Sequence, residues 1–212
     1  VLGIPPLSEA ELTVYAETGG ELHASDPFSV TAGPLLDAAA DLQLETSPGE
    51  APPGYFLASL FGDPELLAIF DMEGRILWAV QQYDEEHGGI DSRVARDGES
   101  ILFNRFAKDK NVDGGAIERI GLDGTPLETI VTPLGHHIFD ELPDGTIAYI
   151  ALDTRDTETY GTVCGDRVVE IGTDGTHREV YSTWDSLTLF ESPTFDSTFY
   201  PQGFDWTHGN SI

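Results

Sequence analysis

The segment Glu170-Ile-Gly-Thr-Asp-Gly-Thr-His-Arg-Glu179 decides the fold, because two earlier segments repeat its pattern. They read Ile69-Phe-Asp-Met-Glu-Gly-Arg-Ile-Leu-Trp78 and Arg119-Ile-Gly-Leu-Asp-Gly-Thr-Pro-Leu127. Each places an Asp-Gly or Glu-Gly pair among apolar residues, and such pairs tolerate the positive φ angles of tight hairpin turns. The turn glycines stand at positions 74, 124 and 175, which are 50 and 51 residues apart. The pattern therefore predicts a β-hairpin that recurs at this period.

A second kind of hairpin alternates with the first. It reads Arg93-Val-Ala-Arg-Asp-Gly-Glu-Ser-Ile-Leu102 and Asp140-Glu-Leu-Pro-Asp-Gly-Thr-Ile-Ala-Tyr149, with glycines 47 residues apart, at 98 and 145. Two hairpins per period make four antiparallel strands, which is typical of β-propeller blades. We predict blades over 90–132 and 136–183, a partial blade over 55–80, and another blade that begins at Phe204. A sandwich of independent hairpins is the alternative.

The composition favours an all-β protein. The 212 residues include 23 glycines and 13 prolines, many of them between short apolar runs, which suits many short strands and few helices. No run of residues approaches the roughly 20 apolar positions of a membrane-spanning helix.

The chain is strongly acidic, with a formal net charge of −28 from 38 acidic and 10 basic side chains. Such a chain repels the phosphate backbone of nucleic acids, so the composition predicts that the protein does not bind nucleic acid. An anionic substrate would need a local positive site. Cys164 is the single cysteine, so no disulfide can form within the chain.

The first 34 residues differ from the repeats. Val1-Leu-Gly-Ile-Pro-Pro-Leu7 and the short extended segments after it predict the C-terminal part of an immunoglobulin- or fibronectin-like β-sandwich over 1–34. Residues 35–54 are interpreted as a linker, and 55–212 as the propeller blades. Both ends of the chain look like cuts through a longer protein, so the ring of blades is expected to be incomplete.

Three motifs stand in order on the predicted blades. The first is Gly135-His-His-Ile-Phe-Asp-Glu-Leu-Pro-Asp-Gly145, the second is Trp184-Asp185, and the third is Phe204-Asp-Trp-Thr-His-Gly-Asn-Ser-Ile212. Together they resemble the arylsulfate sulfotransferase family. The resemblance covers roughly residues 50 to 212.

The resemblance implies a six-bladed propeller behind a sandwich domain, in a periplasmic or secreted protein. It implies transfer of a sulfuryl group from a phenolic sulfate ester to a phenol through a sulfated histidine, without a nucleotide donor or other cofactor. His137, His208 and Asn210, with His136, match positions that hold sulfate oxygens. The nucleophilic histidine and a sulfate-holding arginine are expected beyond Ile212, so this chain would carry part of the site. The remaining blades would come from the same parent protein or from a second chain.

Other interpretations stay open at this point. His136 and His137 are adjacent, so on a regular strand they face opposite sides, and the alternative interpretation of His136 is packing between blades. Trp206 is interpreted as blade core, and Trp184-Asp185 as a structural anchor. The alternative function is a propeller that binds a ligand or a protein without catalysis, since a fold alone does not specify chemistry.

One loop resembles the opening of a calcium-binding loop. Asp109, Asn111 and Asp113 offer oxygen ligands at alternate positions before Gly114. Ile120 occupies the position where an EF-hand has its glutamate, and the alternative is an ordinary connection between strands. Asp109, Asn111 and Asp113 are the candidate ligands of a structural Ca²⁺ if the loop binds a metal.

Overall fold

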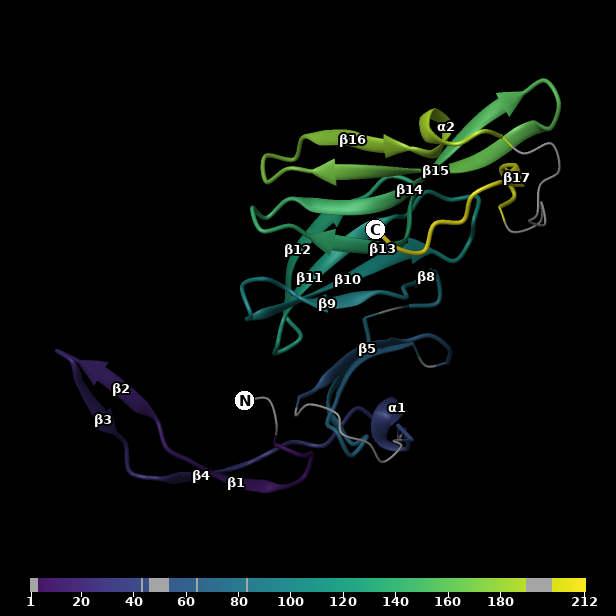
Figure 1. Ribbon diagram of the computed structural model, residues 1–212. Helices are drawn as coiled ribbons and strands as arrows, with labels where there is room; N and C mark the ends of the chain where they lie inside the picture. Colours follow the sequence, from purple (N-terminus) through teal and green to yellow (C-terminus); the bar gives the residue numbers. More distant parts are fainter. Residues whose placement is uncertain (1–3, 43, 46–53, 64, 83, 190–199) are drawn as a thin grey trace. The chain divides into compact units, whose positions relative to one another are not determined.

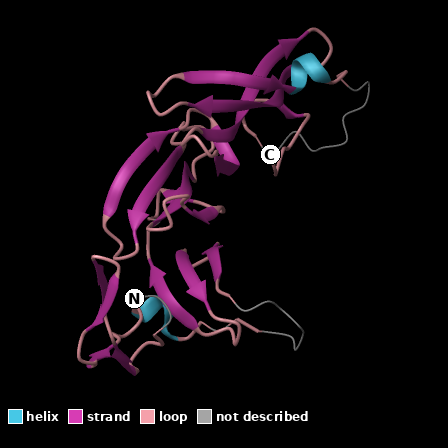
Figure 2. Ribbon diagram, turned by 60° about the vertical axis from the view of Figure 1, so that its left-hand side comes forward, coloured by secondary structure: helices cyan, strands magenta, loops and turns pink. Residues whose placement is uncertain are grey.

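The computed structural model describes residues 4–42, 44–45, 54–63, 65–82, 84–189 and 200–212. The chain divides into two compact units, one formed by 1–58 with 66–81 and the other by 59–65 with 82–212. Strands make up nearly all of the regular structure (Figure 2), and the pairings are antiparallel apart from one short strand. The predicted all-β class is confirmed.

The first unit contains short sheets. Its strands are β1 (Glu9–Leu12), β2 (Tyr15–Thr18), β3 (Glu21–Ala24), β4 (Phe28–Thr31), β5 (Phe56–Leu60), β6 (Leu66–Phe70) and β7 (Ile76–Val80), and its helix is α1 (Asp37–Ala40). β1 pairs with β4, β2 pairs with β3 through the Gly19-Gly20 turn, and β5, β6 and β7 form the sheet expected for the partial blade. The assignment of residues 1–34 to a sandwich stays a prediction.

The second unit begins with a sheet at the first predicted blade. Its strands are β8 (His87–Gly88), β9 (Ser92–Val94), β10 (Ser100–Ala107), β11 (Ala116–Gly121) and β12 (Pro126–Val131). β12, β11 and β10 follow in order, and both β9 and β8 pair with β10 at different points along its length. The hairpin turns fall at Asp97-Gly98 and Asp123-Gly124, where the sequence places them.

A second sheet of the same unit matches the next predicted blade. It contains β13 (Gly135–Glu141), β14 (Ile147–Thr157), β15 (Gly161–Ile171) and β16 (His177–Ser182) in antiparallel order (Figure 1), followed by α2 (Thr183–Ser186). Gly145 and Gly175 have φ angles of 84° and 78°, as the two turns require. The four-stranded sheet over 136–183 is confirmed. A ring of blades around an axis stays a prediction.

The predicted start of a further blade at Phe204 is wrong. Phe204 was expected to begin a further blade, but Phe204–Asp205 form β17, which pairs in parallel with Val163 and Cys164 of β15. β17 therefore adds to the preceding sheet. It can do so because β15 extends past the end of its pairing with β16, and its free backbone groups there accept another strand.

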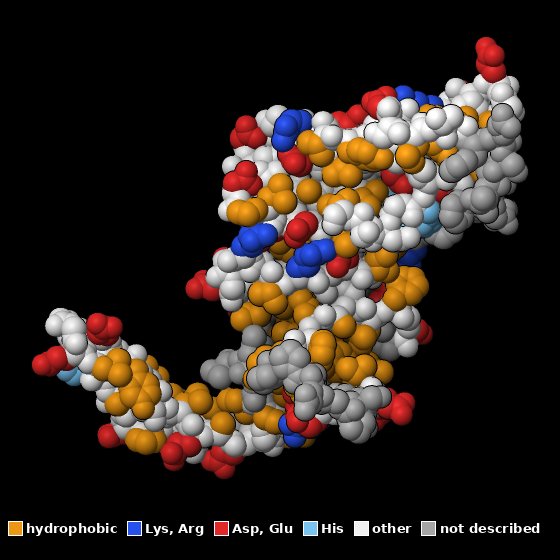
Figure 3. Space-filling model, in the orientation of Figure 1, with side chains coloured by type: hydrophobic (Ala, Val, Ile, Leu, Met, Phe, Trp, Pro, Cys, Tyr) orange, Lys and Arg blue, Asp and Glu red, His pale blue; other side chains and the backbone are white. Residues whose placement is uncertain are grey.

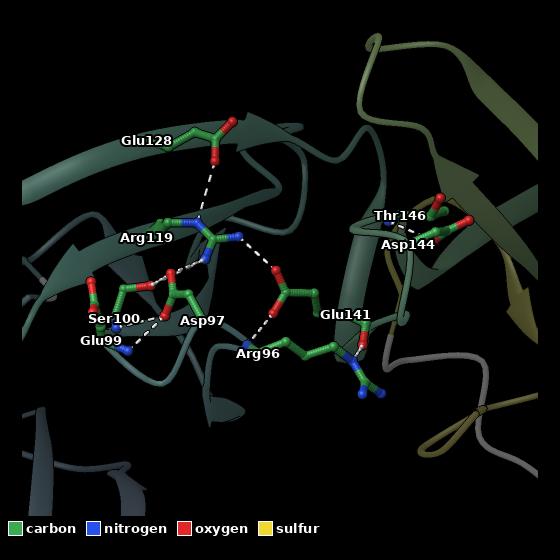
Figure 4. A network of polar contacts seen from close by, with 9 residues as sticks. All are labelled: Arg96, Asp97, Glu99, Ser100, Arg119, Glu128, Glu141, Asp144 and Thr146. Carbon is green, nitrogen blue, oxygen red and sulfur yellow. Dashed lines mark hydrogen bonds and ion pairs between the residues drawn. The ribbon is translucent and has the colours of Figure 1, made fainter. Parts of the chain in front are cut away.

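The two sheets of the second unit share one hydrophobic core. Leu102 and Ile117 from the first sheet are buried in one cluster with Phe139, Tyr149 and Val169 from the second. A polar network closes the same junction (Figure 4): Arg119 on β11 donates to Glu141 on β13 at 2.8 Å, and Glu141 accepts the amide of Arg96 at 2.6 Å. The sheets are therefore packed as neighbours, which positions β13 against β10.

Acidic side chains are spread over the face shown in Figure 3 rather than gathered in one patch. Within the described parts of the chain, no helix is long and apolar enough to cross a bilayer.

Candidate functional site

The first histidine motif lies on a distorted part of β13. His136 is in register with Ile150 of β14, but the next residue in register is Phe139, so His137 and Ile138 form a bulge. His137 also adopts a positive φ of 56°, which is uncommon outside glycine. The bulge turns the two rings toward each other, and their Nδ1 atoms lie 2.7 Å apart. The expectation that these side chains face opposite sides is wrong, because it assumed an undistorted strand.

Asn104 on the neighbouring sheet fixes this backbone. Its amide nitrogen donates to the carbonyl of His137, and its side-chain oxygen accepts the amides of Ile90 and Asp91, both at 2.9 Å. Asn104 is 7% exposed, so these hydrogen bonds are shielded from water. The strained conformation at His137 is thus held by a residue 33 positions earlier in the chain.

The second histidine motif follows β17. His208 donates from Nδ1 to Asp205 at 2.8 Å, and its Nε2 lies 3.2 Å from Nε2 of His137. Trp206 is buried, and its amide donates to the carbonyl of Cys164 at 2.9 Å, which fixes the segment on β15. The interpretation of Trp206 as core is confirmed. His137 and His208 were expected on different blades, whereas β17 joins the sheet that contains β13.

Asp166 on β15 connects both motifs. One carboxylate oxygen accepts the Nε2 hydrogen of His136 at 3.0 Å, and the other accepts the amide of Gly209 at 2.8 Å. Asp166 is 5% exposed and Asp205 is 2% exposed, so each carboxylate lies buried behind an imidazole. Tyr200 stacks on the ring of His208, with centroids 5.4 Å apart and an angle of 22°.

The environment keeps the central ring neutral. Burial first, and then the neighbouring His136 and His208, lower the pKa of His137 to about 4, although Asp166 acts in the opposite direction. A neutral imidazole has one N–H donor and one nitrogen acceptor. The three rings can therefore present donors to the oxygens of an anion, or move a proton between them.

Asn210 is placed differently from the three histidines. Its side-chain amide donates to the carbonyl of His208 at 3.0 Å, and the residue is exposed. β17 ends at Asp205, so the strand does not continue through His208 and Asn210.

Trp184 supports the site from outside. Its indole nitrogen donates to the carbonyl of Asp153 at 2.8 Å, and its ring packs on Trp206 with centroids 4.8 Å apart. The interpretation of Trp184 as an anchor is confirmed. Gly165 must be glycine for this packing, since a Cβ atom there would lie 2.7 Å from the Trp184 indole nitrogen.

The predicted calcium loop connects β10 to β11. Asp109 accepts the amide of Asn111 at 3.0 Å, and Asp113 accepts the amide of Leu134 at 2.9 Å. The part of the chain that the structure describes contains no group of three or more His, Cys, Asp or Glu residues arranged to hold a metal. Calcium binding by Asp109, Asn111 and Asp113 stays a prediction.

Sequence reasoning missed four residues that shape the site: Asn104, Asp166, Tyr200 and Asp205. Asp205 belongs to the quoted motif and lies three positions before His208, so its spacing was visible but had no assigned role. The other three come from separate segments, and no local pattern in the sequence marks them.

Comparison with known proteins identifies the family of the chain. Residues 50–212 match the family model described as Arylsulfotransferase (ASST), which includes both histidine motifs. Neither a curated protein nor a solved structure gives a significant match. Because the matched region makes up more than half of the sequence, the chain belongs to the arylsulfotransferase family.

Proposed function

We propose that this chain forms part of the active site of an arylsulfate sulfotransferase that uses phenolic sulfate esters as donors and phenols as acceptors. Family membership supports arylsulfotransferase activity in general. The observation that carries the finer proposal is the convergence of His136, His137 and His208. Ring nitrogens of His136 and His137 lie 2.7 Å apart, and those of His137 and His208 lie 3.2 Å apart although 71 residues separate these two in sequence.

The three imidazoles suit a sulfuryl group in transfer. Negative charge spreads over its peripheral oxygens as the bond to the leaving group breaks, and positioned N–H donors stabilise that charge. We assign His137 and His208 to this role, with His136 as a third donor, once the contacts between their ring nitrogens open to admit the sulfuryl group. Asn210 follows His208 closely enough to add an amide donor once its hydrogen bond to the backbone opens.

The reaction is a double displacement. A histidine nitrogen forms an N–S bond while the S–O bond of the donor ester breaks, and the leaving phenolate takes up a proton. The oxygen of the acceptor phenol then attacks sulfur, the N–S bond breaks, and the acceptor loses its proton. We place the nucleophilic histidine outside the residues of this sequence, and we expect the complete protein to act in the periplasm or outside the cell.

The test is sulfuryl transfer from an aryl sulfate to a phenol by the purified full-length protein. His137→Ala and His208→Ala should each lower kcat by roughly a hundred- to a thousandfold, which is the usual effect of removing one transition-state donor. His177→Ala is the matched control, because His177 is an exposed histidine on β16. Retention of a radiolabelled sulfuryl group on a histidine after rapid quenching tests the covalent step.

Full activity in both site variants would refute the assignment. Binding of a phenolic sulfate without turnover, by a protein that folds normally, would instead favour a binding propeller.

A further inference from the structure

The site histidines belong to a longer chain of contacts that ends in a carboxylate on each side. In order, it runs Asp166, His136, His137, His208 and Asp205, and the four contacts measure 3.0, 2.7, 3.2 and 2.8 Å. Each carboxylate binds the ring nitrogen that points away from His137. The nitrogen that remains on each outer ring faces one nitrogen of His137.

The number of protons in this chain of contacts follows from its geometry. A contact this short between two nitrogens, or between nitrogen and oxygen, needs one hydrogen between the atoms, because two facing lone pairs repel. Four contacts therefore need four protons, whereas three neutral imidazoles have one N–H each. One more proton than three neutral rings provide must be present.

That proton belongs on a ring. An imidazole is a stronger base than a carboxylate, with reference pKa values of about 6.5 and about 3.9. The second oxygen of Asp166 accepts the Gly209 amide, so both oxygens of this carboxylate act as acceptors. Each outer ring contacts a carboxylate, so the geometry favours His136 or His208 as the ring that holds the positive charge, while His137 connects them through one hydrogen bond on each side.

Two titratable side chains near the rings, Cys164 and Tyr200, leave this count unchanged. Burial raises the pKa of Cys164 on β15 to about 11 and raises the pKa of Tyr200 further, so both stay protonated at neutral pH. Asn104 on β10 contacts His137 through the backbone carbonyl and carries no charge.

We propose that Asp166 and Asp205 are positioning residues that fix the ring tautomers of His136 and His208, so that the three-ring array holds one shared extra proton at neutral pH. The consequence for catalysis rests on the proposed function. A sulfate ester carries a single negative charge, and the array offers a single positive charge in a chain whose formal net charge is −28. Each carboxylate lies behind a ring, where it stabilises the cation without occupying the nitrogens that face His137.

The test reads the ring nitrogens directly. The full-length protein is labelled with ¹⁵N-histidine, and long-range ¹H–¹⁵N spectra are recorded from pH 5 to 9. The wild-type array should still contain a cationic ring above the reference histidine midpoint of about 6.5, and neutral His208 should carry its hydrogen on Nδ1. Three neutral rings at pH 6.5, or neutral His208 with its hydrogen on Nε2, would overturn the proposal even if no variant could be purified.

Two variants then assign the effect. Asp205→Asn and Asp166→Asn should each make the array lose its extra proton at a pH lower by about one unit or more, because an opposite charge in contact shifts a titration by about 1–3 units. Asp185→Asn removes an exposed carboxylate from α2 and should leave the titration unchanged. Identical titration in all four proteins would refute the positioning role.

The same preparations are assayed for sulfuryl transfer across the pH range. If the wild-type protein lacks transfer activity but the two site variants show the expected shifts in ring titration, the proposed function fails and the positioning role stands. If the wild-type protein transfers sulfate but the ring titrations of the variants are unshifted, the positioning role fails and the proposed function stands.

Discussion

Substitution of Glu141 by alanine should lower the free energy of unfolding, because this carboxylate joins the two sheets of the second unit. Its side chain is 10% exposed and that of Arg119 is 17% exposed, and the two lie 2.8 Å apart. Removing one partner of a buried ion pair destabilises a protein by roughly 3–5 kcal/mol. Arg119 would keep its contacts with Asp97 and Ser100. The loss of stability in Glu141→Ala should therefore lie near the lower end of this range, at about 3 kcal/mol.

The structure supplies a matched control on the same guanidinium. Glu128 also contacts Arg119, at 3.4 Å, but its side chain is 54% exposed. An exposed pair of this kind contributes about 0–1 kcal/mol, so Glu128→Ala should change stability little. The stability of Glu141→Gln should lie between those of the two alanine variants, because the side-chain amide oxygen can still accept the hydrogen bond from the Arg96 backbone N–H.

Urea denaturation measures the difference. Trp184 and Trp206 pack together in this unit, so their fluorescence reports its unfolding. With an m value of about 2 kcal/mol/M, a loss of about 3 kcal/mol moves the urea midpoint by about 1.5 M. Equal urea midpoints for Glu141→Ala and Glu128→Ala would refute the argument that the buried Arg119–Glu141 pair contributes more to stability than the exposed Arg119–Glu128 pair.

Two further predictions concern the site. Gly165→Ala should destabilise the second unit and lower the transition temperature, because its Cβ would lie 2.7 Å from Trp184 and Thr183 atoms; a variant as stable as wild type contradicts that packing. The free energy of unfolding should decrease as the pH falls from 6.5 to about 4, because His137 binds a proton in the unfolded chain over this range. In the folded chain the same ring stays neutral until about pH 4. His137→Gln should therefore lose less stability than wild type between pH 6.5 and 4.5 in urea titrations, and a parallel or steeper loss would contradict the neutral ring.

The hairpins could be predicted because their information is local. In the Asp123, Asp144 and Asp174 turns, the carboxylate accepts the amide two residues later at 2.9–3.0 Å, and the following glycine takes the positive φ. These hydrogen bonds also lower the pKa of each of the three aspartates. Residue type and spacing alone determine such a turn, so the sequence predicts the turns of both sheets correctly.

The orientation of the histidines could not be predicted in the same way. The bulge at His137 depends on Asn104, which lies on another sheet, and the contact to His208 depends on the parallel pairing of β17 with β15. Both are tertiary interactions. The sequence identifies the residue types that meet, but alternation along an ideal strand gives the wrong direction for His136 relative to His137.

The shared core has a consequence for how the chain is made. Leu102 and Ile117 leave the ribosome before their partners Tyr149 and Val169 exist, so the first sheet cannot bury its apolar face at that time. The delay between Ile117 and Ile171 is roughly fifty residues of synthesis, or several seconds at about 5–20 residues per second. Because the core is shared, we expect the two sheets to acquire protection from proteolysis together, once β15 has emerged.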